Sequence, residues 1–322
     1  MARLWLWLLA AWLPFQAWAE PPGDPLSWVG RIATAGQKLT YVGTFTYQSG
    51  ARLETSRIIH VRDGGGELEK LETLDGSPRE VIRSSTGEVR CVLPTQKTVI
   101  IDQAGGRRVF PSRLVEGWTG LAENYRIRRG ELGRVAGLEA QQIVLEPKDD
   151  LRYAQILWAD LQSGLLLKSR LVDEQGETIE QFAFNEVKIG GEVDRAQLQS
   201  RYGGEQAGWH VLDARGNELR GEGVGWGVRN GLPGFRQTSI VRRQLGPGNE
   251  AVQMVFSDGL VAISVFVEPL PTEAAKAATG AFRSGAINIF KRALGSSQVT
   301  ALGEVPPRAV QRLAEAVEPL KR

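Results

Sequence analysis

The spacing of apolar residues along the chain predicts few helices, the first of them close to the N-terminal end. Leu26, Val29 and Ile32 recur at intervals of three, which places them on one face of a helix. Asp24 precedes this run and is followed by a proline, the combination typical of an N-cap and a first helical turn. We expect a short amphipathic helix that starts after Asp24 and ends before Gly36.

The same spacing predicts two further helices. Leu114, Trp118 and Leu121 lie three or four residues apart, which indicates a helical insertion that lies over one face of a sheet. Near the C-terminal end, two prolines at residues 306–307 precede an apolar face that runs from Val310 to Val317. This face predicts a final amphipathic helix.

Most of the chain instead alternates between apolar and polar residues, which is the period of a β-strand. From Leu39 onward, Tyr41, Phe45 and Tyr47 fall on one face of such a strand. Short runs of this kind between turn residues predict strands at 56–62, 81–84, 88–93, 97–102, 125–128, 140–146, 153–159, 165–172 and 179–187, and later at 238–243, 251–256, 260–268, 286–290 and 299–303, with a hairpin turn at 257–259. So many closely spaced strands favour antiparallel sheet, as a curved sheet or partly closed barrel.

A length of 322 residues favours two domains. Two glycine pairs, at residues 190–191 and 203–204, flank a polar stretch that we expect to be the linker between them. Arg3, an apolar run from Leu4 to Leu13 and a small-residue exit at Ala19 are typical of a secretory signal peptide. We therefore expect a signal peptide at residues 1–19, cleaved after Ala19. The expected parts of the remaining chain are a first domain at 20–189, a linker at 190–207 and a second domain at 208–322.

The residues that carry chemistry argue against an enzyme. The two histidines, His60 and His210, lie far apart in the chain, so a histidine-rich zinc site is not expected. The glycine-rich stretch at 221–234 lacks the spacing of a phosphate-binding loop, and no nucleophile-elbow motif is present. Acidic pairs such as Asp149-Asp150 lie in predicted turns, where solvated charge is the ordinary explanation. We expect a binding protein without catalytic residues, metal or cofactor.

The charge and the single cysteine argue against a nucleic-acid-binding protein and against a disulfide-stabilised fold. The 39 basic and 37 acidic residues give a net charge of +2, without the basic clusters typical of proteins that bind nucleic acid. Cys91 is the only cysteine, so the chain has no internal disulfide. It alternates with Val89 and Leu93, which favours a small buried residue over a reactive thiol.

Short strings of residues along the chain together resemble the RseB/MucB family. One of them is Leu232-Pro233-Gly234-Phe235 in the second domain. The complete ordered set lies at residues 41–47, 53–60, 74–83, 91–94, 164–169, 180–182, 232–235, 256–260, 264–269 and 303–306. One such string is weak, but the ordered set spans nearly the whole chain after the signal peptide.

The resemblance implies an α+β, mainly antiparallel fold, in which a LolA/LolB-like unclosed β-barrel with covering helices is followed by a smaller mixed α/β domain. Members of the family bind the periplasmic domain of a membrane-spanning anti-sigma factor, RseA or MucA, and shield it from the site-1 protease DegS. Lipid or lipopolysaccharide fragments are thought to relieve this shielding. The implied function is negative regulation of the sigma-E envelope-stress response by a soluble periplasmic protein, whose state as a monomer or homodimer stays open.

The alternative function is a periplasmic lipid or lipoprotein carrier, which would leave the second domain without a role. A hydrolase would need a polar cluster inside the groove, and the sequence names none. The candidates for the lining of a lipid-binding groove share a strand face or lie on the predicted covering helix: Tyr41, Phe45, Tyr47 and Trp118. The candidates for the partner surface lie on two predicted strands of the second domain: Arg242, Arg243, Leu260 and Phe266. For both sets the alternative is an ordinary core or solvated surface.

Overall fold

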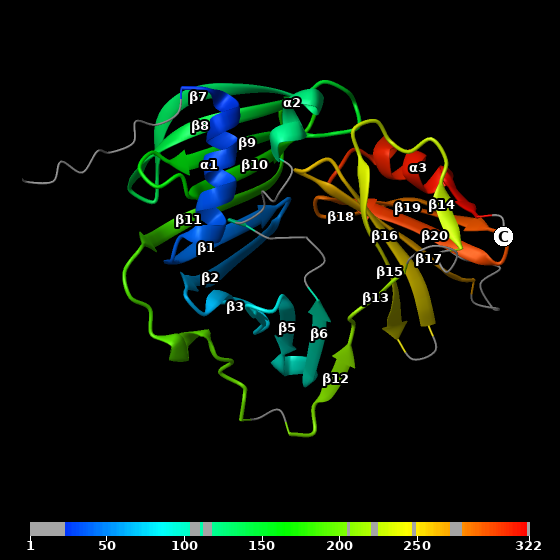
Figure 1. The fold of residues 1–322 in the computed structure, drawn as a ribbon, viewed down its shortest axis with the longest axis horizontal. Coiled ribbons are helices and arrows are strands. Elements are labelled where there is room, and N and C mark those ends of the chain that lie inside the picture. Colours follow the sequence, from blue (N-terminus) through cyan, green and yellow to red (C-terminus); the bar gives the residue numbers. More distant parts are fainter. Residues whose placement is uncertain are drawn as a thin grey trace, which may run out of the picture.

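A computed structural model describes residues 23–103, 110–111, 118–204, 207–219, 225–246, 249–270 and 279–320. The predicted signal peptide and residues 112–117 of the predicted helical insertion lie outside these ranges. Two large β-sheets lie next to each other, one of twelve strands and one of seven (Figure 1). The prediction of an α+β, mainly antiparallel protein with an unclosed first sheet is confirmed.

The first sheet curls around the first helix (Figure 1). Its strands follow the order β12-β6-β5-β4-β3-β2-β1-β11-β10-β9-β8-β7, so that in the described part of the chain β12 and β7 are its two ends. Neighbouring strands are antiparallel, except that β12 and β6 are parallel. The strands are Tyr41–Ser49 (β1), Arg52–Asp63 (β2), Gly66–Thr73 (β3), Glu80–Arg83 (β4), Glu88–Leu93 (β5), Thr98–Gln103 (β6), Tyr125–Val135 (β7), Leu138–Pro147 (β8), Ala154–Asp160 (β9), Leu166–Val172 (β10), Thr178–Ile189 (β11) and His210–Asp213 (β12).

Helix α1 (Pro25–Lys38) begins where the sequence predicts it. The Asp24 carboxylate caps it by accepting a hydrogen bond from the Ser27 backbone N–H at 2.8 Å. The helix continues past Gly36 to Lys38, although the sequence predicts that it ends before Gly36. Gly36 is buried, and its carbonyl accepts a hydrogen bond from the Tyr41 hydroxyl at 3.3 Å, so the last turn packs against the strand that follows.

Strand β3 (Gly66–Thr73) has no counterpart among the predicted strands. Its Glu69, Lys70 and Glu72 are almost fully buried, and charges at buried positions hide the alternation on which strand prediction depends. The burial is possible because the charges are paired. The Lys70 ammonium lies 3.0 Å from a Glu80 carboxylate oxygen and 3.5 Å from one of Glu72.

The predicted linker packs on the first sheet, on the face away from α1. We call residues 195–201 the strap. Leu198, at the end of the short 3-10 helix Arg195–Leu198, packs against Ile59 and Val61. The carbonyl of Gln199 accepts a hydrogen bond from the Lys70 ammonium at 2.8 Å. The strap therefore covers buried charges that would otherwise face water.

Strand β12 (His210–Asp213) follows the strap and extends the first sheet. Residues 210–213 pair with residues 98–101 of β6, although the sequence places them in the second domain. The chain crosses to the second sheet directly afterwards, since Asn217 of β13 (Asn217–Glu218) pairs with Arg242. The boundary at residue 208 stays a prediction.

The second sheet has the order β13-β15-β16-β17-β20-β19-β18. Its strands beyond β13 are Arg236–Gly246 (β15), Asn249–Ser257 (β16), Ala262–Pro269 (β17), Gly280–Ser284 (β18), Ile287–Leu294 (β19) and Ser297–Gly303 (β20). Helix α3 (Pro307–Glu315) packs on one face of this sheet through Val310 and Leu313. The predicted helix is too long at its end, because Val317 belongs to β21 (Val317–Pro319), which pairs with β14 (Trp226–Val228).

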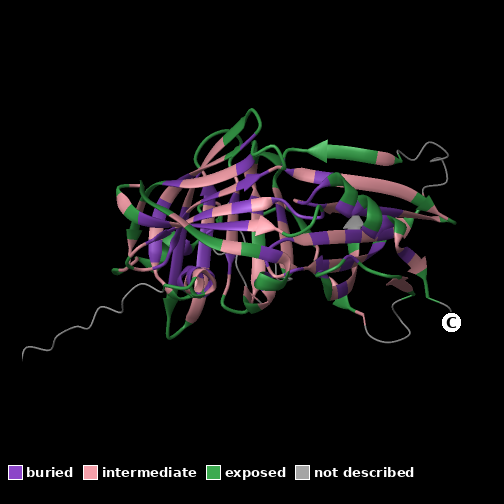
Figure 2. Ribbon diagram, turned by 90° about the horizontal axis from the view of Figure 1, so that it is seen from above, coloured by how far each residue is buried: buried purple, intermediate pink, exposed green. Residues whose placement is uncertain are grey.

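Buried residues run through both domains (Figure 2). A single cluster of buried apolar residues includes Trp28 and Tyr125 from the first domain together with Phe256 and Leu313 from the second. The domains therefore share part of one hydrophobic core, which is unusual for domains joined only by a flexible linker.

Candidate functional site

Five aromatic rings gather on the side of the first sheet that faces α1, and we call them the aromatic cluster. The antiparallel pairing of β1 with β11 sets Phe45 opposite Phe184 and Tyr47 opposite Phe182. Phe110 completes the cluster and stacks on Phe182, with ring centroids 5.4 Å apart and an interplanar angle of 10°. The Tyr47 and Phe182 centroids are 4.7 Å apart. Such ring pairs add to the stability gained from burial alone.

The aromatic cluster has a buried part and an accessible edge. Phe45 and Phe110 are 3% and 0% exposed, whereas Tyr47 and Phe182 are partly exposed. The Tyr47 hydroxyl donates a hydrogen bond to Glu180 at 3.3 Å, and burial raises the pKa of Tyr47. Two of the four groove candidates, Phe45 and Tyr47, thus lie together in this cluster.

Tyr41 lies away from the aromatic cluster and packs as a core residue. Its side chain is fully buried, and its ring stacks on His60 with centroids 4.7 Å apart. His60 is also fully buried, and its Nδ1 lies 2.7 Å from the Leu39 carbonyl oxygen, so this nitrogen is the donor. Both side chains serve to fix the end of α1 against the sheet.

Trp118 packs against the outside of α1. It starts a short 3-10 helix, Trp118–Gly120, that leads into helix α2 (Leu121–Asn124). A Cβ atom built on Gly30 would lie 2.6 Å from the indole ring, so only glycine leaves room for it. Trp118 is the fourth groove candidate, and it is separated from the aromatic cluster.

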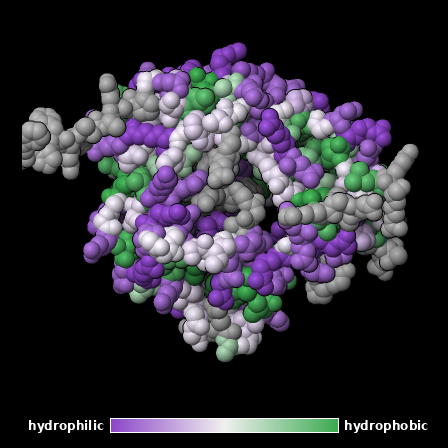
Figure 3. All heavy atoms as spheres, viewed as in Figure 1, coloured by the Kyte–Doolittle hydropathy of each residue, from purple (hydrophilic) through white to green (hydrophobic). Residues whose placement is uncertain are grey.

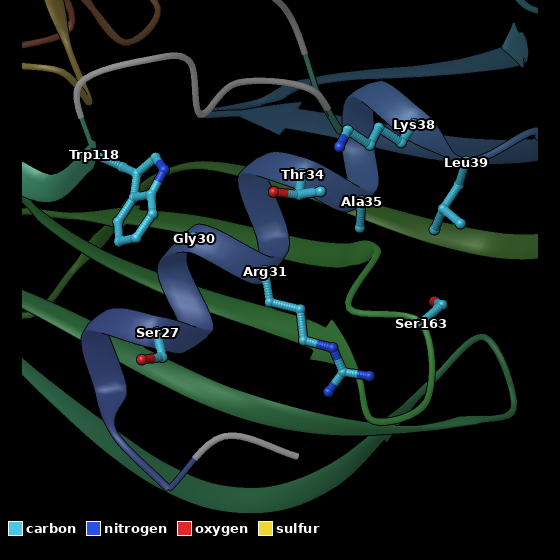
Figure 4. A pocket seen from close by; sticks show the side chains of 9 residues that line it. All are labelled: Ser27, Gly30, Arg31, Thr34, Ala35, Lys38, Leu39, Trp118 and Ser163. Atoms are coloured by element: carbon cyan, nitrogen blue, oxygen red, sulfur yellow. The ribbon is translucent and has the colours of Figure 1, made fainter. Parts of the chain in front are cut away.

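An open pocket of about 410 Å³ runs along α1 beside Trp118 (Figure 4). Its wall includes the apolar Leu39 and the cationic Arg31 and Lys38. Arg31 reaches toward the turn that carries Ser163 and donates to the Gln162 carbonyl, and burial lowers the pKa of Arg31. The combination of an indole, aliphatic carbons and two cations suits a small molecule that has an apolar part and an anionic group.

The partner-surface candidates occupy different environments. Arg242 is exposed and lies 3.5 Å from Glu250 on the neighbouring strand. Arg243 reaches Asp102 of β6 at 3.2 Å, so it joins the two domains. Phe266 is partly exposed, on the face of the second sheet away from α3.

Leu260, the fourth partner-surface candidate, is 8% exposed and belongs to the shared core. Elsewhere the most exposed apolar side chains, such as Leu53, Leu132 and Val211, lie on separate strands. Accordingly, the side seen in Figure 3 has only small apolar patches among hydrophilic residues.

The two domains meet at a buried polar contact, which we call the joint. Arg152 of the first domain lies 2.6 Å from Asp258 of the second, and both side chains are 0% exposed. Tyr125 donates a hydrogen bond to the same Asp258 oxygen at 2.9 Å. Burial, and next the Asp258 charge, raise the pKa of Tyr125 well above its usual value. Arg152 also donates to the Pro233 carbonyl at 2.8 Å.

Close approach at the joint requires a particular glycine. Gly234 has a φ of +73°, and a Cβ there would lie 2.1 Å from the Asn124 side-chain oxygen. The guanidinium of Arg152 lies 4.4 Å from the Phe235 ring centroid. The predicted hairpin turn between β16 and β17 holds Asp258, whose second oxygen accepts hydrogen bonds from the Leu260 and Val261 backbones. The joint thus fixes the relative position of the two domains.

Cys91 lies on β5 and is only partly buried, whereas the sequence predicts a buried residue; the buried residue of this strand is its neighbour Val92, which is 1% exposed. Burial raises the pKa of the Cys91 thiol, which lowers the fraction of reactive thiolate near neutral pH. We therefore expect iodoacetamide to alkylate Cys91 at pH 8 more slowly in the folded protein than in urea. Equal rates, followed by mass spectrometry, would contradict this placement.

The described residues contain no group of three histidine, cysteine, aspartate or glutamate side chains that could hold a metal ion. None of the helices in the described ranges is both long and apolar enough to cross a membrane.

Two sheet-based domains that share a core and a buried joint define a two-domain, mainly antiparallel β protein. Sequence profiles give the family: the MucB/RseB N-terminal domain matches residues 24–202, and the MucB/RseB C-terminal domain matches residues 220–318. The chain belongs to the MucB/RseB family, as the resemblance in its sequence indicates.

Curated relatives match over nearly their whole length. The sigma factor AlgU regulatory protein MucB of Pseudomonas aeruginosa is 31% identical over 307 residues, which cover 94% of this chain and 93% of the relative. The sigma-E factor regulatory protein RseB of Escherichia coli K12 is 26% identical over 334 residues, covering 99% and 98%.

Solved structures agree with this assignment. A crystal structure of MucB in complex with MucA(peri) has a TM-score of 0.70 and 28% identity, and the match covers 93% of this chain and 100% of that one. The complex of Pseudomonas aeruginosa MucA and MucB gives a TM-score of 0.72 at 26% identity, with the same coverage.

Sequence reasoning missed three rings of the aromatic cluster and the residues of the joint. Phe182 and Phe184 alternate within a strand that the sequence predicts, so their shared face was a usable signal. Their position opposite Tyr47 and Phe45 depends on the pairing of β1 with β11, which lie far apart in the chain. Arg152 and Asp258 carry no local signal, because each looks like an ordinary turn residue.

Proposed function

We propose that the protein is a periplasmic negative regulator of the sigma-E envelope-stress response. It binds the periplasmic domain of a MucA- or RseA-type membrane-spanning anti-sigma factor and shields that domain from site-1 proteolysis. The observation that carries the proposal is the full-length similarity to MucB, at both the sequence level and the level of a structure in complex with MucA(peri). The signal peptide predicted at residues 1–19 supports the proposed location.

The role of the second domain supports regulation over lipid carriage. A carrier would need only the first sheet with its aromatic cluster. In this chain the joint and the shared core commit the second sheet to a fixed position beside the first. A fixed arrangement of two domains suits the recognition of a protein segment that contacts both, because the binding surface is organised before the partner arrives.

Lipid or lipopolysaccharide fragments are the proposed signal that weakens partner binding. Two features support a lipid site: the aromatic cluster, whose edge at Tyr47 and Phe182 is partly exposed, and the pocket along α1 with its Arg31 and Lys38 cations. Within the pocket, the Trp118 ring and the two cations match the acyl chains and phosphates of such a ligand. The exposed edge of the aromatic cluster is a second, separate apolar surface. Linkage then requires that the anti-sigma segment and the lipid weaken each other's binding by the same factor.

The direct test is binding of the purified mature chain to the periplasmic domain of its cognate anti-sigma factor by titration calorimetry. We expect a stable complex, and a lower apparent affinity when lipopolysaccharide fragments are present. A lysozyme titration under the same conditions controls for nonspecific association. No measurable binding to the cognate domain would remove the regulator proposal and leave lipid carriage as the remaining function.

A further inference from the structure

The outer face of the first sheet, on the side away from α1, is covered in one part and open in another. The strap packs on this face over β2 and β3. Over β7 to β10 no helix of the described chain lies on it (Figure 1). Helix α1 packs on the opposite side, where Ile143 and Leu157 are buried in the core. The residues of β7 to β10 that alternate with these two form what we call the open face.

Two rows of side chains cross the open face from β7 toward β10. The register places Arg128, Val144, Ile156 and Arg170 in the first row, and Gln142, Trp158 and Lys168 in the second. Apolar side chains lie at the centre of both rows, and the cations lie at their ends. Val144 is only 5% exposed although no helix covers it, so the aliphatic stems of its long neighbours shield it while their charged ends point to water.

The open face carries an excess of positive charge. Arg126, Arg128, Lys168 and Arg170 belong to it, and among the described residues of β7 to β10 its one carboxylate is Glu146, which lies 3.0 Å from Arg128. The chain as a whole is nearly balanced, with 39 basic and 37 acidic residues. The charge is therefore gathered on this face, where it favours an anionic partner.

The two cations of β10 have no carboxylate to neutralise them. Within the described ranges Lys168 makes no hydrogen bond or ion pair, and its Nζ lies 4.9 Å from the centroid of the Trp158 ring. Arg170 donates to the Thr178 hydroxyl at 2.6 Å. Burial, and next the Arg170 charge, lower the pKa of Lys168. Two like charges are thus held near each other, and an approaching anion would relieve their repulsion.

The composition of the open face fits a lipid surface better than an acidic protein segment. Strands β8, β9 and β10 have hydrogen-bonded neighbours on both sides, so the face offers no free strand edge with which a peptide could pair. Its cations are spread over two margins of the face, which suits many separate phosphates more than one acidic side chain. Tryptophan beside long basic side chains is the combination that proteins place at the boundary between bilayer and water.

We propose that the open face binds the surface of an anionic phospholipid bilayer. Arg128, Lys168 and Arg170 contact lipid phosphates, and Trp158 contacts the headgroup region. This contact is separate from the pocket along α1 and from the aromatic cluster, which lie on the other side of the sheet. The inference goes beyond the proposed function and does not depend on it, because it concerns the membrane and not the anti-sigma factor.

The test measures binding of the purified mature chain to vesicles by cosedimentation. We expect binding to vesicles of phosphatidylglycerol and phosphatidylcholine, little binding to phosphatidylcholine alone, and a loss of binding as NaCl screens the charges. The double variant Lys168→Gln/Arg170→Gln is expected to bind the anionic vesicles about 10-fold or more weakly. The matched control is Lys97→Gln/Arg215→Gln, which removes the same charge from two exposed residues near β6 and β12, far from β10 in the sheet order.

Three results would overturn the inference. They are no binding of the wild type to anionic vesicles, equal binding by the two double variants, and binding to soluble polyglutamate in place of vesicles, which would make the face a site for an acidic protein segment. Unfolding midpoints show whether each variant is folded. Should Lys168→Gln/Arg170→Gln unfold, Arg126→Gln/Arg128→Gln replaces it, because both arginines are exposed. Weaker vesicle binding by that variant supports the inference, and unchanged binding overturns it.

Discussion

Replacing Asp258 by alanine is expected to lower the free energy of unfolding by about 3 kcal/mol, because it breaks a fully buried ion pair and leaves Arg152 only the partly exposed Asp149 as a counter-charge. Both side chains are 0% exposed, and Asp258 accepts hydrogen bonds from Tyr125 and from two backbone N–H groups of its own turn. No water can reach the guanidinium to replace these contacts without opening the joint. Urea unfolding, followed by circular dichroism, measures the change.

Arg308→Ala is the matched control for the joint. Arg308 also crosses between the domains, where it contacts Asp150 and Glu174 at 2.6 Å each, but all three side chains are about half exposed. Solvated ion pairs contribute little, so this variant is expected to unfold close to the wild-type midpoint. Equal midpoints for Asp258→Ala and Arg308→Ala would mean that the joint does not hold the domains together.

Lys70→Met is expected to have the second large effect, a loss of about 3 kcal/mol or more of unfolding free energy. Its ammonium lies between Glu72 and Glu80, and all three side chains are at most 7% exposed. Methionine fills the same volume but removes the cation shared by two buried carboxylates. Glu72 keeps Arg201 at 3.0 Å and Arg57 at 3.9 Å, whereas Glu80 loses the ammonium that lies 3.0 Å from it. The substitution also removes the hydrogen bond from Lys70 to the Gln199 carbonyl. Urea unfolding measures the stability, and hydrogen exchange should show faster exchange in the strap.

Arg195→Ala controls for the strap as a whole. Arg195 pairs with Asp63 at the other end of the strap, where the side chains are 58% and 39% exposed. The hydrogen bond from Arg195 lowers the pKa of Asp63, yet water solvates both groups. We expect a much smaller change than for Lys70→Met. If the two variants unfold at the same urea concentration, the buried charges are not what secures the strap.

Sequence reasoning succeeded where local rules decide the structure. The Asp24 cap and the helical spacing after it place α1 correctly, since capping depends on neighbouring residues only. The hairpin at residues 257–259 forms as expected, because its turn and its alternating strands are contiguous in the chain. The sequence predictions that failed did so because tertiary contacts, which local patterns do not show, determine those parts of the structure. Strand β3 carries buried charges that the strap satisfies from more than a hundred residues away.

The candidate site was predictable only in part, for the same reason. Phe45 and Tyr47 share a strand face, which the sequence shows directly. That Phe110 stacks on Phe182 depends on the return of a distant segment to the sheet. Asp149, which looks like a solvated turn charge, instead contacts the buried Arg152. Leu260 lies beside a turn, and the sequence suggested that it belongs to the partner surface. In the structure it is 8% exposed and part of the shared core.

Protection of the anti-sigma factor from proteolysis is the direct test of the regulator function. The purified mature chain is incubated with the cognate anti-sigma periplasmic domain, activated site-1 protease is added, and cleavage is followed with and without lipopolysaccharide fragments. We expect the chain to slow cleavage and the lipopolysaccharide fragments to restore it. Cleavage at the same rate with and without the chain would contradict the regulator function, even if the two proteins bind.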